Sequence, residues 1–163
     1  MAFANGAYII LLTSLVLSTT DGSVKKGYGI DLMAFKCGDL DALANISWWY
    51  NWDANLKQIE EKSGCKIDEK YVPLFVPIIW GYNPSWSPDR YSVDDRYDIV
   101  LGFNEPNHKS QSNLTAQEAA DAWYIVEQEA DNKKIASPAA ARCGSGCHIF
   151  AGTQTDHLVE WVI

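Results

Sequence analysis

Short apolar runs alternate with amphipathic stretches along most of the chain. The runs contain the aromatic and β-branched residues that are typical of β-strands, and the stretches between them show helical spacing. The pattern predicts strands at 26–31, 47–52, 74–79, 98–103 and 134–139. It predicts helices at 39–44, 54–63, 115–130 and 157–163.

Local signals mark several boundaries of these elements. Thr115 and Glu118 form the sequence pattern of a capping box, in which each side chain satisfies a free backbone N–H of the other. Gly64 is a reasonable stop for the helix before it. Prolines within the apolar run 71–80 argue against a central antiparallel strand there, so the regular part is placed at 74–79. One apolar stripe is expected along helix 115–130, formed by Ala116, Ala119, Ala120, Trp123, Val126 and Ala130.

The alternation of strands and helices indicates an α/β fold with a parallel sheet covered by helices. No glycine-rich phosphate loop is present, so a dinucleotide-binding fold lacks its fingerprint, and we expect no cofactor. A (β/α)8 TIM barrel fits better, with functional residues at the C-terminal ends of the strands. About five βα units are predicted, whereas such barrels typically need ~250 residues. The barrel is therefore expected to be incomplete.

The first residues have the character of a processing segment. An apolar run from Ala7 to Leu17 is too short to span a bilayer comfortably, and small residues follow it. No Lys or Arg precedes Lys25, which departs from the usual pattern. We expect a signal peptide at 1–23, cleaved between Ser18 and Ser23, rather than an uncleaved anchor. The protein would then be secreted, with one domain at 24–163 and no integral membrane span.

Composition limits the classes of partner. The chain is 47% hydrophobic and carries a formal charge of -8, without low-complexity tracts. An acidic chain with no basic patch is a poor ligand for nucleic acid or for an anionic membrane. A neutral ligand such as a sugar is compatible with this charge.

Sequons and cysteines agree with secretion. Asn45 and Asn113 each begin an N-glycosylation tripeptide. The chain has four cysteines, an even number that an oxidising compartment would allow. We expect two disulfides rather than a zinc site, because the spacings match no ligand pattern. The expected pairs are Cys37 with Cys65 and Cys143 with Cys147.

The most informative residues are Asn104, Glu105 and Pro106, which end the predicted strand 98–103. Proline cannot donate to a sheet ladder, so an amide and a carboxyl group are left side by side where the strand stops. In parallel α/β folds this end of a strand carries the chemistry. Glu105 is thus a candidate general acid/base. The alternative is a simple turn in which Glu105 faces water.

Five blocks of sequence, in this order and spacing, resemble glycoside hydrolase family 128, the alkali-sensitive-linkage type of β-1,3-glucanase domain. The blocks are 47–52 (Ser-Trp-Trp-Tyr-Asn-Trp), 75–81 (Phe-Val-Pro-Ile-Ile-Trp-Gly), 101–107 (Leu-Gly-Phe-Asn-Glu-Pro-Asn), 114–123 (Leu-Thr-Ala-Gln-Glu-Ala-Ala-Asp-Ala-Trp) and 136–139 (Ala-Ser-Pro-Ala). The resemblance runs from about Lys26 to the C-terminus.

The resemblance implies a (β/α)8 barrel that hydrolyses β-1,3-glucan with retention. It makes Glu105 the acid/base and Asn104 the amide that orients the sugar. The family's second glutamate, the nucleophile, follows a later strand and has no counterpart here; Glu127, Glu129 and Glu160 lie in predicted helices. We therefore expect 24–163 to be a truncated catalytic domain, inactive alone and monomeric if complete. The rival hypothesis is a non-catalytic carbohydrate-binding or cell-wall protein.

The aromatic residues have two interpretations. They can stack on glucose rings, or they can fill the core, as we expect for Trp123 on its helix stripe. In the predicted strand 47–52, alternation separates Trp49 from the other rings, so only one set faces the barrel lumen. The candidate sugar-binding residues are Trp80 and Trp86, followed by Trp48, Tyr50, Asn51 and Trp52. We expect no metal site.

Overall fold

The computed structural model describes residues 23–43, 45–142 and 145–148. Four short strands are formed by β1 (Gly27–Gly29), β2 (Trp48–Tyr50), β3 (Ile99–Leu101) and β4 (Lys134–Ala136). The helices are α1 (Asp39–Ala42), α2 (Leu56–Ser63), α3 (Ala116–Ala122) and α4 (Tyr124–Ala130), with one-turn 3-10 helices η1 (Val72–Leu74) and η2 (Pro88–Arg90). The expected signal peptide and the expected helix 157–163 lie outside the described residues, apart from Ser23.

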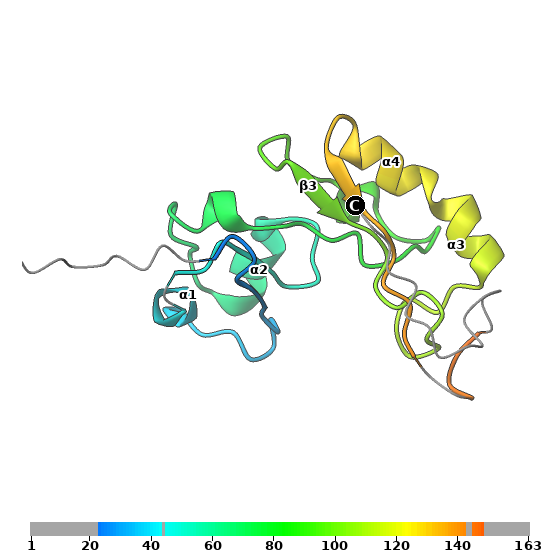
Figure 1. The fold of residues 1–163 in the computed structure, drawn as a ribbon, viewed down its shortest axis with the longest axis horizontal. Helices are drawn as coiled ribbons and strands as arrows, with labels where there is room; N and C mark the ends of the chain where they lie inside the picture. The colour runs from blue at the N-terminus through cyan, green and yellow to red at the C-terminus, as the bar shows by residue number, and fades with distance from the viewer. Residues whose placement is uncertain (1–22, 44, 143–144, 149–163) are drawn as a thin grey trace, which may run out of the picture.

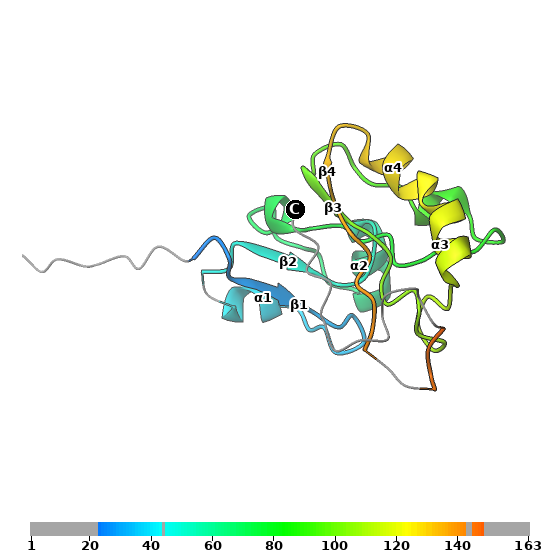
Figure 2. The same ribbon diagram turned by 45° about the vertical axis from the view of Figure 1, so that its right-hand side comes forward.

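Both strand pairings in the described part of the chain are parallel, as the alternation of elements predicted. β1 pairs with β2 and β3 pairs with β4, so that the two pairs form separate two-stranded sheets. Figure 2 shows both pairs, with the segment 75–80 running between them. This segment donates on both sides: the N–H of Val76 donates to the carbonyl of Trp49, and the N–H of Ile79 donates to the carbonyl of Leu101. The spatial order is therefore β1, β2, 75–80, β3, β4, and no closed barrel is formed by the part of the chain described.

The predicted strand at 74–79 is wrong as a regular strand. Residues 72–74 form η1, and two isolated bridges, Trp49 to Phe75 and Ile78 to Leu101, replace a continuous ladder. Pro73 and Pro77 explain the difference, because neither has an N–H to donate. The segment still occupies the place of a strand between β2 and β3.

Capping residues set the helix ends. The side chain of Asn55 caps α2, which ends at Gly64 with a φ of 70°. The predicted capping box of Thr115 and Glu118 is present at α3. The single helix expected at 115–130 is divided at Trp123, where the N–H groups of Trp123 and Val126 bond three residues back rather than four.

One apolar core connects the helices to the outer side of the strands. Its fully buried side chains include Trp49, Val100, Phe103 and Val126. Figure 1 shows α3 and α4 running along one side of β3, where the Trp123 ring lies so close to Gly102 that a Cβ on this glycine would come within 2.5 Å of it. The predicted stripe was partly wrong: the buried alanines are Ala119, Ala122 and Ala130, while Ala116 and Ala120 are exposed.

The first disulfide prediction is confirmed. Cys37 and Cys65 are joined, with their Cα atoms 5.3 Å apart, and link the start of α1 to the end of α2. Cys143 lies outside the described residues, so its pairing with Cys147 stays a prediction. Among the described residues, no helix is both long enough and apolar enough to cross a membrane.

Candidate active site

The site forms where the segment 75–80, β3 and β4 end. Beyond β3, the N–H of Asn104 donates to the carbonyl of Trp80 at 2.8 Å, and the N–H of Glu105 donates to Ala139 at 2.9 Å. Residues 104 and 105 are thus held between the two neighbouring segments, at the strand ends where the sequence placed them.

Glu105 has an unusual backbone conformation. Its φ of 41° lies in the left-handed region that few non-glycine residues adopt. The next residue, Pro106, is fully buried, and the Glu105 carbonyl accepts from His108 at 2.9 Å, which closes the turn. The side chain is half-buried, and among the described residues its carboxyl group makes no hydrogen bond or ion pair.

The amide of Asn104 is held from both sides. The indole N–H of Trp52 donates to its Oδ1 at 3.2 Å, and its Nδ2 donates to Oε1 of Gln111 at 3.1 Å. An indole can only donate, so the oxygen of the amide must face Trp52 and the nitrogen must face Gln111. Trp52 itself has a φ of 64°, so both strand ends use left-handed residues to present their side chains.

Gln111 and Ser112 are site residues that the sequence analysis missed. The Ser112 hydroxyl lies 2.5 Å from the carbonyl oxygens of both Trp80 and Asn104, and so connects the two strand ends. Their position depends on a loop that folds back seven residues after Asn104. No spacing rule in the sequence predicts such a return.

The alternation expected for strand 47–52 is confirmed. Trp49 is fully buried on the core side, against Phe75. Trp48 and Tyr50 stack with ring centroids 6.3 Å apart, and Tyr50 meets Trp52 edge-on at 4.8 Å. These three half-buried rings form a row along the other face of β2, which we call the aromatic row. Only its last member, Trp52, contacts Asn104.

β1 makes room for this row through its two glycines. A Cβ on Gly27 would come within 2.0 Å of the Trp48 ring, and one on Gly29 within 2.9 Å of the Tyr50 ring. The two rings therefore lie across the backbone of β1.

Trp80, the last residue of the segment 75–80, lies close to Trp86 in the loop that follows. Their ring centroids are 6.3 Å apart, and the guanidinium of Arg90 lies 4.2 Å over the Trp86 ring. One face of Trp86 is thus covered by a cation. Asn51 is 4% exposed, and its Nδ2 has no partner among the described residues.

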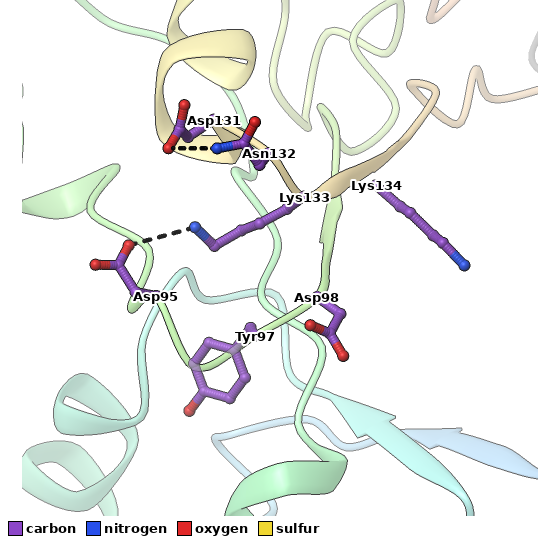
Figure 3. A pocket seen from close by; sticks show the side chains of 7 residues that line it. All are labelled: Asp95, Tyr97, Asp98, Asp131, Asn132, Lys133 and Lys134. Carbon is purple, nitrogen blue, oxygen red and sulfur yellow. Dashed lines mark hydrogen bonds and ion pairs between the residues drawn. The ribbon is translucent and has the colours of Figure 1, made fainter.

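Two cavities formed by the described residues lie elsewhere. One, of about 450 Å³, opens at the N-terminal ends of β3 and β4, where the almost buried Lys133 reaches Asp95 at 3.5 Å (Figure 3). The other, of about 420 Å³, lies between Tyr82 and the start of α3. Neither is lined by Glu105. No group of three or more metal-ligating side chains is found in the described ranges.

The remaining sequence candidates are the expected glycosylation sites and the other glutamates. Asn45 and Asn113, the expected glycosylation sites, are both exposed and have positive φ values of 59° and 53°. Glu129, on α4, accepts a hydrogen bond from the N–H of Val93 at 3.1 Å. Glu127 is exposed on the same helix, and Glu160 lies outside the described residues.

The comparisons with known proteins agree on one group of enzymes. A family model described as the glycosyl hydrolase catalytic core matches residues 33–162. Three solved β-1,3-glucanases of glycoside hydrolase family 128 are similar in structure. The endo-enzyme of Sorangium cellulosum is 30% identical, with a TM-score of 0.52 over 75% of this chain and 49% of its own. The curdlan-specific exo-enzyme of Blastomyces gilchristii, in complex with glucose, is 25% identical, with a TM-score of 0.55 over 78% and 51%.

The third is a variant endo-enzyme of Amycolatopsis mediterranei in complex with laminaritriose and laminaribiose. It is 26% identical, with a TM-score of 0.51 over 74% of this chain and 45% of its own. The chain thus spans about half the length of these solved relatives. No curated protein matches it significantly.

Proposed function

The chain belongs to glycoside hydrolase family 128, and we propose from this membership that it carries the acid/base half of a retaining β-1,3-glucan hydrolase site. The observation that carries the proposal is Glu105, presented at the end of β3 beside an amide that Trp52 and Gln111 hold in one orientation. The fold proposed for the complete domain is the (β/α)8 barrel, of which β1, β2, the segment 75–80, β3 and β4 would be consecutive members.

In the proposed reaction, the Glu105 carboxyl group protonates the leaving glycosidic oxygen and later removes a proton from water. Retention also needs a nucleophilic carboxylate roughly 5–5.5 Å away. We propose that this second group belongs to the complete family domain. Hydrolysis is accordingly proposed for the complete domain, and glucan binding for the residues described here.

Glucan binding would use the amide and the rings at the site. The second N–H of the Asn104 amide is not used among the described residues, so it can donate to a sugar hydroxyl. Trp52 and Trp80 lie at the same strand ends and offer apolar faces to glucose. Trp48 and Tyr50 precede Trp52 in the chain and lie on β2 itself, away from Asn104. They contribute less to the proposal.

The test is a titration of the protein with laminari-oligosaccharides and, for comparison, cello-oligosaccharides of equal length. We expect binding of the first class, and a loss of roughly five- to tenfold in affinity for Asn104→Ala, as the loss of one hydrogen bond implies. Tyr124→Ala, an exposed ring on α4, is the matched control. Equal binding of both sugar classes, or no binding at all, would contradict the proposal.

We also propose that the protein is secreted and glycosylated. The disulfide between Cys37 and Cys65 and the exposed sequon residues Asn45 and Asn113 support this location. Expression in a eukaryotic secretory host, followed by glycosidase treatment and mass spectrometry of the medium, tests it.

A further inference from the structure

Gln111 belongs to a loop that leaves the end of β3 and returns to it. The N–H of Leu114 donates to the carbonyl of Pro106 at 2.7 Å, which closes the loop 106–114. Inside it, the N–H groups of Gln111 and Asn113 both donate to the carbonyl of His108. This closure brings residues 111 and 112 back over Asn104.

The loop is fixed to its surroundings on two sides. On the strand side, the single proton of the Ser112 hydroxyl is shared between the carbonyl oxygens of Trp80 and Asn104. On the other side, Asn107, only 2% exposed, bonds both the N–H and the carbonyl of Ala141, at 2.8 and 2.9 Å. Gln111 therefore approaches Asn104 from a backbone that is held in place.

The side chain of Gln111 supplies what the Asn104 amide otherwise lacks. Rotation about χ2 of an asparagine is broad and roughly two-fold, so one bond from Trp52 leaves the plane of the amide poorly defined. The acceptor Oε1 of Gln111, 3.1 Å from Nδ2, fixes the opposite end. One N–H of Nδ2 is then occupied, and the other points in one direction only.

We propose that Gln111 is a positioning residue, which holds the Asn104 amide in the orientation that presents its free N–H to the sugar. The inference that this N–H binds a sugar rests on the proposed function. The orientation itself depends only on the contacts among Trp52, Asn104 and Gln111.

The test follows the indole N–H of Trp52 by NMR, since this proton reports directly on Asn104 Oδ1. Trp52→Phe identifies its resonance among those of the seven tryptophans. Gln111→Met has nearly the same shape but no acceptor, and Gln111→Glu keeps an acceptor. Gln117→Met removes a glutamine that bonds Asp121 on the exposed side of α3 and serves as the control.

We expect hydrogen exchange of the Trp52 indole to accelerate roughly five- to tenfold in Gln111→Met, as the loss of one hydrogen bond implies. Exchange should stay within about twofold of the original protein in Gln111→Glu and in the control, where that bond is kept. Unchanged exchange in Gln111→Met, or loss of protection in Gln111→Glu, would overturn the proposal. The Glu variant therefore keeps the proposal open to refutation even if Gln111→Met fails to fold.

Laminaritriose titration of the same variants separates the two proposals. If Gln111 positions the amide for a sugar, Gln111→Met lowers the affinity about as much as Asn104→Ala, while Gln111→Glu restores it. If the original protein binds no glucan, the proposed function fails, and the indole exchange still decides whether Gln111 orients Asn104.

Discussion

The indole N–H of Trp52 donates a hydrogen bond to the side-chain oxygen of Asn104, 52 residues later in the chain. This contact joins the end of β2 to the end of β3 across the segment between them. It places an aromatic ring and an amide next to the carboxyl-bearing residue Glu105. The proposed sugar site combines these three groups.

Glu105→Gln is expected to abolish the hydrolysis of laminarin by the complete domain, because the amide cannot transfer the proton. General acid/base groups contribute about 10²–10⁴-fold, so the loss should be at least a hundredfold. The Kd for laminaritriose should change little. Reducing-sugar release and titration measure the two effects, with Glu127→Gln on the exposed side of α4 as the control. Retained turnover would exclude Glu105 as the acid/base.

The left-handed backbone conformation of Glu105 should lower the stability of the protein by a measurable amount. At a φ of 41°, a side chain with a Cβ costs roughly 1–2 kcal/mol, whereas glycine does not have this cost. We expect Glu105→Gly to be more stable to urea than Glu105→Ala by about 1 kcal/mol. Equal stability of the two variants would show that the turn is not strained.

Tyr97 should make the protein sensitive to alkali. It is 5% exposed in the core, and burial raises its pKa to about 12 from its ordinary value of 10.0. The folded protein thus holds the phenol proton more tightly than the unfolded chain does, so stability is full below pH 10 and falls as the pH rises toward 12. Urea unfolding measured across this range should show the loss. Tyr97→Phe should flatten this part of the profile; an unchanged slope would assign the loss to other groups.

The disulfide of Cys37 and Cys65 closes a loop with a sequence separation of 28 residues. In the chain-entropy model a loop of this size stabilises a fold by about 3–4 kcal/mol. Replacing both cysteines by serine should lower the free energy of unfolding by this amount. A double variant as stable as the original protein would mean that the unfolded chain is compact in this region. Denaturant unfolding under oxidising conditions provides the measurement.

Features encoded by neighbouring residues could be predicted from the sequence. The capping box of Thr115 and Glu118 and the stop at Gly64 need only local spacing, and both are present. The opposite directions of Trp49 and the aromatic row follow from the two-residue period of a strand. The strand expected at 74–79 was wrong because two prolines interrupt the ladder that the apolar pattern implied.

Only part of the candidate site could be predicted from local sequence patterns. Asn104 and Glu105 were found because Pro106 forces the strand to end. The roles of Gln111 and Ser112 depend on a loop that returns through backbone contacts, and the role of Trp52 depends on a tertiary contact. Whether Trp86 binds a sugar stays a prediction, since Arg90 covers one of its faces.

The two glycines of β1 limit how this surface can be altered. The rings of Trp48 and Tyr50 pack on the backbone at Gly27 and Gly29, respectively. Any larger residue at either glycine would therefore have to displace the ring that packs on it. Reshaping this face of β2 therefore requires changes in both strands together. Space would be gained by replacing the aromatic residues of β2 with smaller ones, and not by adding side chains to β1.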